Sequence, residues 1–147
     1  MANAWRMTIL VLAVSAVALP IFLHAGTGWA QTPESALHLT IQETPIGRVC
    51  ADGKGMTLYT FNRDSPGKSN CVSNCLRTWS PVFATPDAKA TRPLTTITRD
   101  DGTKQWAYND LPLYRLPRDA NPGNINGENM GTIWHALPAA VDPPLAR

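Results

Sequence analysis

An internal repeat constrains the fold of this chain more than any other feature of its sequence. The chain aligns with itself at an offset of 55 residues, which places GMTLYTFNRD (residues 55–64) over DLPLYRLPRD (residues 110–119). The matched pairs are Leu58/Leu113, Tyr59/Tyr114, Phe61/Leu116, Arg63/Arg118 and Asp64/Asp119. Residues shared at one fixed offset are the signature of a duplicated structural unit. We therefore expect two copies of one unit within the chain.

The repeat continues beyond the matched block. Each copy next reaches a Pro-Gly step, Pro66-Gly67 and Pro122-Gly123, with one residue inserted in the second copy. The offset then returns to 55 at Trp79 and Trp134, each of which precedes a short apolar segment. The predicted unit is a hairpin, a strand carrying Leu-Tyr, an Arg-Asp corner, a loop and a strand that begins near Trp.

Short alternating segments separated by turn residues indicate β-structure. LHLTI (37–41), MTLYTF (56–61) and KQWAY (104–108) alternate with period two and lie between Gly- and Pro-containing turns. Asp101-Gly102 and Asp52-Gly53 mark hairpin turns, because these residues tolerate positive φ. The fold class predicted is all-β, with mostly antiparallel short strands in two pseudo-repeat units and one short helix near residues 72–79.

The first thirty residues resemble an export signal. Arg6 precedes an uncharged apolar run from Met7 to Leu23, and small residues stand before a predicted cleavage after Ala30. The predicted organisation is a signal peptide (1–30), an N-terminal segment with an edge strand (31–46), a duplicated β domain (47–137, units about 47–83 and 95–137) and a flexible tail (138–147). No cysteine precedes Cys50, so we expect a periplasmic or secreted protein without lipid attachment and without a stable membrane span after cleavage.

The distribution of charge argues against a nucleic-acid partner. The whole chain has 13 Lys and Arg against 11 Asp and Glu, and removal of Arg6 with the signal leaves 12 against 11. These charges are scattered rather than gathered in a basic stripe, so nucleic-acid binding is not expected. The partner itself is open, with an envelope protein or a small ligand as the candidates.

Cys71 and Cys75 are predicted to form a disulfide, since an exported chain meets an oxidising compartment. Closure of so short a loop contributes about 2 kcal/mol in the chain-entropy model. A redox-active pair and a zinc or copper site stay as alternatives. Their further ligands would come from Cys50, His38, His135, Met56 and Met130. For Cys50 itself, a small buried hydrophobe is the simple interpretation and an intermolecular disulfide the other.

Catalytic chemistry is not visible in the sequence. Asp64 and Asp119 could be paired carboxylates, but each follows an Arg and precedes a Pro-Gly turn, where Asp commonly binds local backbone. His135 has no nucleophile motif nearby, and no hydrolase, zinc-protease or phosphate-loop motif occurs. We expect no enzyme activity, no catalytic residue, no metal and no cofactor.

The segment YTFNRD (59–64) resembles a bacterial family of secreted repeats of unknown function, predicted lipoproteins with a Tyr-x-aromatic-x-x-Asp motif. The resemblance extends over most of the predicted mature chain and implies an exported β-rich domain with no established activity. Its motif residues would have a structural or a ligand-facing role, and here they are Tyr59, Phe61, Asp64, Tyr114 and Asp119. The chain departs from the pattern at Leu116, where an aromatic residue is expected, and in its extra Cys50.

Two functional hypotheses follow from the sequence. The first is a non-catalytic binding or accessory module of the cell envelope, with aromatic residues filling the core and lining any groove between the units. These aromatic residues are Tyr59, Phe61, Trp79, Trp106, Tyr108, Tyr114 and Trp134. The second is a periplasmic redox or copper-handling protein that uses Cys71 and Cys75.

Overall fold

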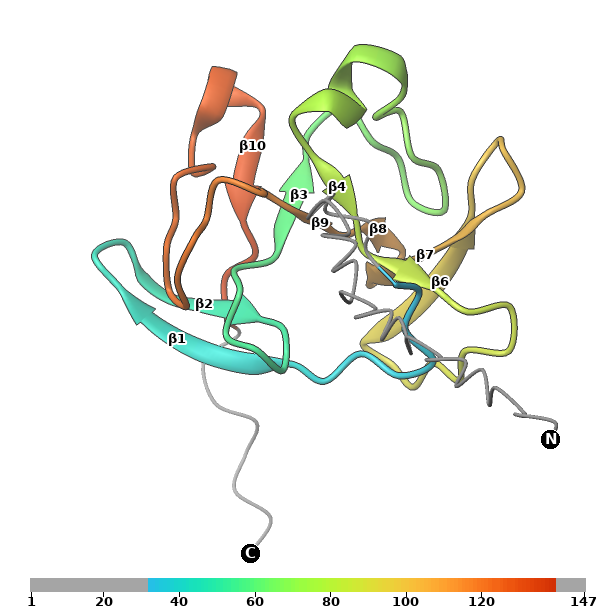
Figure 1. Cartoon of the computed structure of the whole chain (residues 1–147), viewed down its shortest axis with the longest axis horizontal. Helices are drawn as coiled ribbons and strands as arrows, with labels where there is room; N and C mark the ends of the chain where they lie inside the picture. The colour runs from blue at the N-terminus through green and yellow to red at the C-terminus, as the bar shows by residue number, and fades with distance from the viewer. Residues whose placement is uncertain (1–31, 140–147) are drawn as a thin grey trace, which may run out of the picture.

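The structure, a computed structural model, describes residues 32–139. These residues form three antiparallel sheets and two single 3-10 turns (Figure 1). The elements are β1 (Thr40–Thr44), β2 (Gly47–Ala51), β3 (Tyr59–Phe61), η1 (Ser73–Arg77), β4 (Ser80–Pro81), β5 (Phe83–Ala84), β6 (Leu94–Thr98), β7 (Lys104–Tyr108), β8 (Leu111–Pro112), β9 (Tyr114–Arg115), η2 (Met130–Thr132) and β10 (Trp134–Ala136). The all-β prediction with two repeat units is confirmed. The predicted signal peptide and most of the predicted tail lie outside the described residues, within which no helix is long and apolar enough to span a membrane.

The central sheet joins the two units crosswise. Its strand order is β10-β3-β9-β4, and the two Leu-Tyr strands meet in its middle with Tyr59 opposite Tyr114. The outer strands are exchanged, because β10 of the second unit pairs with β3 of the first, while β4 of the first unit pairs with β9 of the second (Figure 1). Neither unit therefore completes its own part of this sheet.

Both faces of the central sheet are covered, as the alternation of a strand requires. Leu58 and Leu113 enter one apolar cluster, and Tyr59 and Tyr114 enter the other. The tyrosine side consists of Val49, Tyr59, Phe61, Cys71, Trp79, Tyr114, Leu116, Trp134 and Ala136. The leucine side consists of Leu37, Cys50, Leu58, Val82, Ala84, Trp106, Leu113 and Leu137. Because both faces are buried, each position of the Leu-Tyr pair carries a large, mainly apolar side chain.

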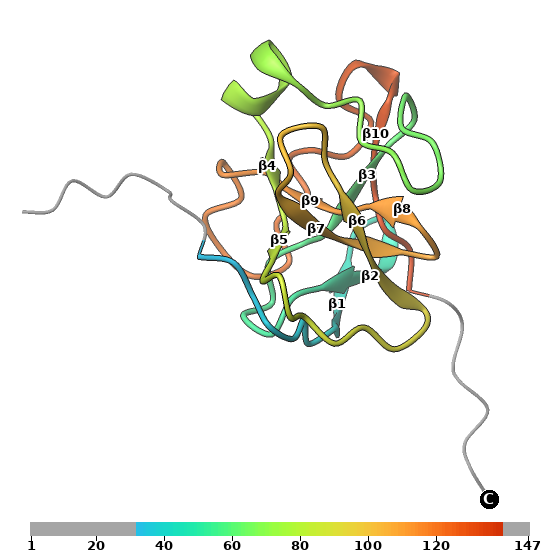
Figure 2. The same ribbon diagram turned by 90° about the vertical axis from the view of Figure 1, so that its right-hand side faces the viewer.

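The hairpin around Asp101-Gly102 forms as predicted. Strands β6 and β7 pair from Leu94/Tyr108 to Thr98/Lys104, Gly102 has a φ of +82°, and the Asp101 carboxylate accepts the Thr103 N–H at 3.0 Å. Viewed from the side, this hairpin and β8 lie in front of the central sheet (Figure 2). The Asp52-Gly53 turn is also present, with the Asp52 N–H donated to Met56 O.

The first strand differs from its prediction. It begins at Thr40 rather than at Leu37 and pairs only with β2, across a turn at residues 45–46. Ile41 is 44% exposed, although Leu37 before the strand is buried. An edge strand can leave one face in solvent, so period-two alternation alone does not locate its ends.

The predicted helix is a 3-10 turn over Ser73–Arg77. Ser73 has a positive φ of 49°, and the chain enters β4 at Ser80. So short a segment favours the tighter 3-10 turn over an α-helix.

Candidate functional site

The two motifs bind each other through their tyrosines and aspartates. Tyr59 Oη donates to Asp119 Oδ2 at 2.6 Å, and Tyr114 Oη donates to Asp64 Oδ2 at 2.6 Å. The tyrosine of each unit is therefore bonded to the aspartate of the other unit. This exchange follows from the central sheet, where β3 and β9 lie side by side.

The second oxygen of each aspartate binds the loop that follows it. Asp64 Oδ1 accepts the Asn70 N–H at 2.6 Å, and Asp119 Oδ1 accepts the Asn126 N–H at 3.0 Å. Each asparagine amide in turn donates to the carbonyl of the motif arginine, Arg63 or Arg118. The two carboxylates thus hold backbone and do not face each other as a catalytic pair.

Burial supports the structural role of the motif over the ligand-facing one. Tyr59 and Tyr114 are fully buried, and Asp119 is 3% exposed. Burial and the bonded carboxylate raise the pKa of both tyrosines well above their ordinary value. Burial also raises the pKa of Asp64, although its hydrogen bonds and the Arg99 charge oppose the change.

Of the other predicted aromatic residues, Phe61, Trp79 and Trp134 fill the core on the tyrosine side. Trp106 and Tyr108 lie on the leucine side. Trp79 and Trp134 stack with ring centroids 3.7 Å apart, and Phe61 stacks on Trp134 at 4.3 Å. Tyr59 and Tyr114 meet these indoles edge to face. Rings packed in this way are not available to line a groove, since their faces are already covered.

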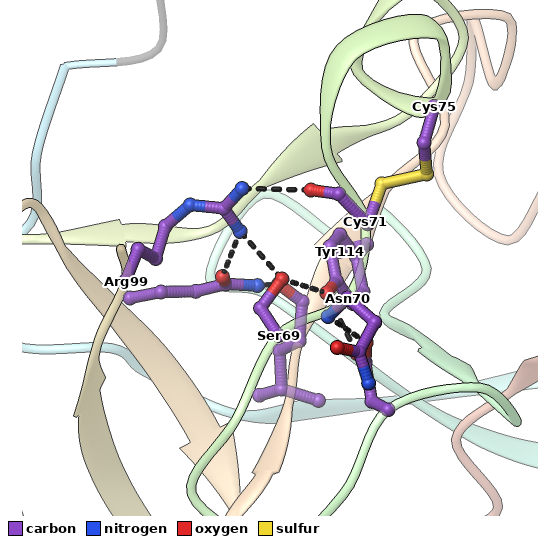
Figure 3. Close-up of a disulfide and its surroundings, with 9 residues drawn as sticks. Ser69, Asn70, Cys71, Cys75, Arg99 and Tyr114 are labelled. Carbon is purple, nitrogen blue, oxygen red and sulfur yellow. Dashed lines mark hydrogen bonds between the residues drawn. A yellow bond between two sulfur atoms is a disulfide. The ribbon is translucent and has the colours of Figure 1, made fainter. Parts of the chain in front are cut away.

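The predicted disulfide between Cys71 and Cys75 is present, with Cα atoms 5.3 Å apart (Figure 3). Cys71 O accepts from Arg99 Nη2 at 2.7 Å. Arg99 Nη1 also donates to Ser69 Oγ, which is 2.7 Å from Tyr114 Oη. The disulfide corner is therefore linked to the Tyr114–Asp64 contact through one arginine and one serine.

The second unit has Gly127 near the position that Cys71 occupies in the first. The Gly127 N–H donates to Tyr59 Oη at 3.3 Å. A Cβ at this position would come within 2.8 Å of Tyr59 Cε1, closer than real Cβ contacts allow. The absence of cysteine from the second copy thus has a steric reason.

Cys50 lies in the leucine-side cluster, and its thiol contacts Pro138 O at 3.7 Å. Burial raises the pKa of this thiol, which disfavours the reactive thiolate. Among residues 32–139, no three His, Cys, Asp or Glu side chains are grouped so as to hold a metal ion. Cys71 and Cys75 are bonded to each other, so neither has a free thiol in this structure.

A cavity of about 600 Å³ lies among residues far from the disulfide in the sequence, none of which is part of the loop from Cys71 to Cys75. Its lining residues are Thr32, Pro33, Glu34, Ala36, His38, Asp52, Gly53, Lys54, Met56, Thr57, Arg115, Leu116, Pro117, Asp119 and Ala120. These residues come from the N-terminal segment, the Asp52-Gly53 turn and the strand β9 with its following corner. No Phe, Tyr or Trp is among the described residues that line the cavity.

Arg115 is fixed within this lining by two carboxylates. Its Nε donates to Asp52 Oδ2 at 2.8 Å, and its Nη2 donates to Glu34 Oε1 at 2.7 Å. Asp52 Oδ1 accepts the backbone N–H groups of Lys54 and Met56. Charge-assisted bonds of this kind hold a guanidinium rigidly, so the charged side of the cavity is preorganised.

Comparison with known families identifies the chain. A family model described as a secreted repeat of unknown function matches residues 40–83 and 95–138, more than half of the chain. The chain belongs to this family. No curated protein and no solved structure matches it. Each matched segment of the secreted repeat contains a hairpin, a Leu-Tyr strand and the Trp of the repeat, Trp79 or Trp134, and the first begins at the start of β1.

The sequence pattern identified the motif residues of this secreted repeat but not the charged residues that lie around them. Arg99, Arg115 and Glu34 were not singled out. Both arginines are buried, and a buried arginine requires partners. The available signal was position, since Arg115 directly follows Tyr114 of the repeated Leu-Tyr strand.

Proposed function

We propose that this secreted repeat is an exported, non-catalytic binding module of the cell envelope whose ligand occupies the cavity beside Arg115. The supporting observation is the fixed Arg115 guanidinium, held by Glu34 and Asp52 in the lining of that cavity. Pockets that combine apolar surface with a few fixed polar groups are the usual sites of small ligands.

The lining favours binding over catalysis. Both oxygens of Asp52 and of Asp119 are engaged in hydrogen bonds, and the Thr57 hydroxyl donates to Asn124 O. A general base needs a free lone pair within reach of a reacting group, and a nucleophile needs such a base beside it. The polar groups of Asp52, Asp119 and Thr57 instead hold the lining itself.

Charges of both signs suggest the chemistry of the ligand. The Lys54 side chain is exposed and has no ion-pair partner among the described residues, while the Glu34 side chain is 34% exposed. Apolar surface between them comes from Ala36, Met56 and Leu116. A small zwitterion with an apolar part, such as an amino acid or a dipeptide, matches this arrangement.

A cavity-blocking substitution tests the binding site. Ala120 is exposed and lines the cavity, whereas Ala90 is exposed and lies outside it, so Ala120→Trp and Ala90→Trp form a matched pair. We expect amino acids or dipeptides to raise the Tm of the exported protein and of Ala90→Trp, but not of Ala120→Trp. Equal shifts in both variants would contradict the site. Turnover on a hydrolase and oxidoreductase panel would contradict the non-catalytic assignment.

The cellular location is part of the proposal. A periplasmic protein cleaved after Ala30 would begin at Gln31 when isolated from the periplasm. Mass spectrometry of the amino-terminal peptide from fractionated cells measures this directly. Recovery of the uncleaved chain in the membrane fraction would show that the segment is retained as an anchor.

A further inference from the structure

Arg99 is a buried cation whose hydrogen-bond partners are all neutral. It is 6% exposed, and it donates to the hydroxyl of Ser69, the amide oxygen of Gln105 and the carbonyl of Cys71. Its Nε is buried without any partner. Within residues 32–139, no carboxylate lies within ion-pair distance of its guanidinium. This differs from Arg115, which is held by two carboxylates.

An unpaired buried charge is costly, and native proteins normally pair it or bring an ion to it. A chain of hydrogen bonds runs from Arg99 through Ser69 to Tyr114 (Figure 3). It ends at the Asp64 carboxylate, which accepts from Tyr114 Oη. Two hydroxyl groups therefore separate the two charges. Among the described residues, no carboxylate therefore bonds to Arg99 directly, although Asp64 and Asp101 lie near enough for their charges to act on it.

A second cavity of about 230 Å³ lies against Arg99. Besides Arg99, its lining consists of Ser69, Val72, Ser73, Leu76, Asp100 and Asp101. Val72 and Leu76 are among the most exposed large apolar side chains of the described residues. Val72 lies within the loop that the Cys71–Cys75 disulfide closes, and Leu76 directly follows Cys75, so the bridge holds an apolar rim beside a buried cation.

We propose that this second cavity binds a small aliphatic monocarboxylate, with its carboxylate toward Arg99 and its hydrocarbon chain against Val72 and Leu76. The carboxylate supplies the directly bonded anion that Arg99 lacks, and the chain covers exposed apolar surface. The site is separate from the Arg115 cavity, with which it shares no lining residue.

The two aspartates of the lining set the selectivity of this site. Asp100 is paired with the Lys68 ammonium, and the Asp101 carboxylate binds Thr103. Their negative charges disfavour a dianion more than a monoanion, because repulsion grows with the charge of the ligand. Short monocarboxylates should therefore bind more tightly than inorganic phosphate.

Titration of the exported protein with four probes tests the ligand class. We expect hexanoate to bind more tightly than butyrate, and both to bind more tightly than phosphate, with hexylammonium not binding. Calorimetry or amide chemical shifts of residues around Arg99 provide the measurement. Binding of hexylammonium as tight as that of hexanoate, or tighter binding of phosphate, would overturn the proposal.

A pair of leucine variants locates the site without disturbing the core. Leu76 and Leu111 are 41% and 39% exposed, and only Leu76 lines the cavity. We expect Leu76→Ser to weaken hexanoate binding about fivefold to tenfold, as loss of part of an apolar contact implies, and Leu111→Ser to leave it unchanged. Equal affinities in the two variants would overturn the assignment.

Two further variants test the role of the Arg99 charge and whether the ligand instead binds in the Arg115 cavity. If the Arg99→Gln protein folds, it should not bind hexanoate. If it does not fold, the comparison of Leu76→Ser with Leu111→Ser tests the site instead. Ala120→Trp should retain full hexanoate affinity, so failure of either cavity is recognised independently of the other. Loss of hexanoate binding in Ala120→Trp would place the ligand in the Arg115 cavity and contradict this site.

Discussion

Tyr59 with Asp119 and Tyr114 with Asp64 are the same contact made twice, at the same distance of 2.6 Å, in different surroundings. Asp119 is buried, and the second group on Tyr59 is the Gly127 N–H. Asp64 is half-buried, and the second group on Tyr114 is Ser69, which leads to Arg99. In one copy, the loop after the aspartate packs tightly on the core at Gly127. In the other, the loop is held by the hydrogen bonds through Ser69 and Arg99 and by the disulfide.

The difference shows what the duplication requires. Both copies keep the Tyr–Asp bond across the units and the aspartate-held loop. The contacts that hold this loop against the core differ between the two copies. The cation in the polar corner of the first copy is Arg99, which comes from the second unit and has only neutral hydrogen-bond partners. The proposed monocarboxylate site lies at this corner.

The largest effect is expected from Gly127→Ala. Its new Cβ would collide with Tyr59 and Trp79, so we expect a loss of roughly 3 kcal/mol, at the upper end for overpacking. Gly67→Ala serves as the control in the first copy, because nothing lies within 4 Å of its Cβ and only its positive φ of 78° is strained. Urea unfolding measures both. A Gly127→Ala protein no less stable than Gly67→Ala would show that the second copy is loosely packed.

Removal of the tyrosine hydroxyls compares the two contacts directly. Tyr59→Phe leaves the buried Asp119 without its partner, which should cost about 2–3 kcal/mol. Tyr114→Phe leaves a half-buried Asp64 that solvent can reach, which should cost about 1–2 kcal/mol. Chemical denaturation of the two variants gives the ranking. The reverse order would mean that the Arg99 chain contributes more than the burial of Asp119.

Reduction of the disulfide perturbs only the first copy. In the chain-entropy model, opening this five-residue loop lowers stability by about 2 kcal/mol or less. Unfolding of oxidised and thiol-reduced protein measures the change, with a Cys50→Ala variant as the control for the buried thiol. Loss of the whole fold on reduction would contradict the description of the bridge as a local constraint.

Alkaline pH should weaken both contacts gradually. Because the pKa values of Tyr59 and Tyr114 are raised, the folded state keeps two protons that the unfolded chain releases above about pH 10. Stability therefore falls as pH rises beyond that value, by about 1 kcal/mol per tyrosine for each further pH unit. Tyrosinate absorbance recorded with circular dichroism checks this. Ionisation of both residues in a protein that stays folded would show that their hydroxyls reach solvent.

Much of the fold could be predicted from local signals. The Asp101-Gly102 turn specified a hairpin, and the repeat specified two units. Local signals could not show the exchange of β4 and β10, because a Trp strand pairs equally well in sequence terms with the Leu-Tyr strand of either unit. Long-range pairing depends on how the loops cross, which neither alternation nor turn chemistry encodes.

The candidate site was less predictable than the fold. A carboxylate after Arg and before Pro-Gly indicated a backbone-binding role for Asp64 and Asp119, but their tyrosine partners lie 50 and 60 residues away. Arg99 stands beside an obvious turn, so its pattern is that of a solvated residue. Its burial arises from the disulfide loop folding over it, a tertiary contact without a local signature.

A double-mutant cycle measures whether the Tyr–Asp hydrogen bond joins residues of different units. Tyr59→Phe combined with Asp119→Asn should show a coupling of about 2 kcal/mol, since each single change removes the same buried bond. Tyr59→Phe combined with Asp64→Asn, which lies in the same unit, should be additive within about 0.5 kcal/mol. Coupling within the unit and additivity across the units would contradict the crosswise arrangement.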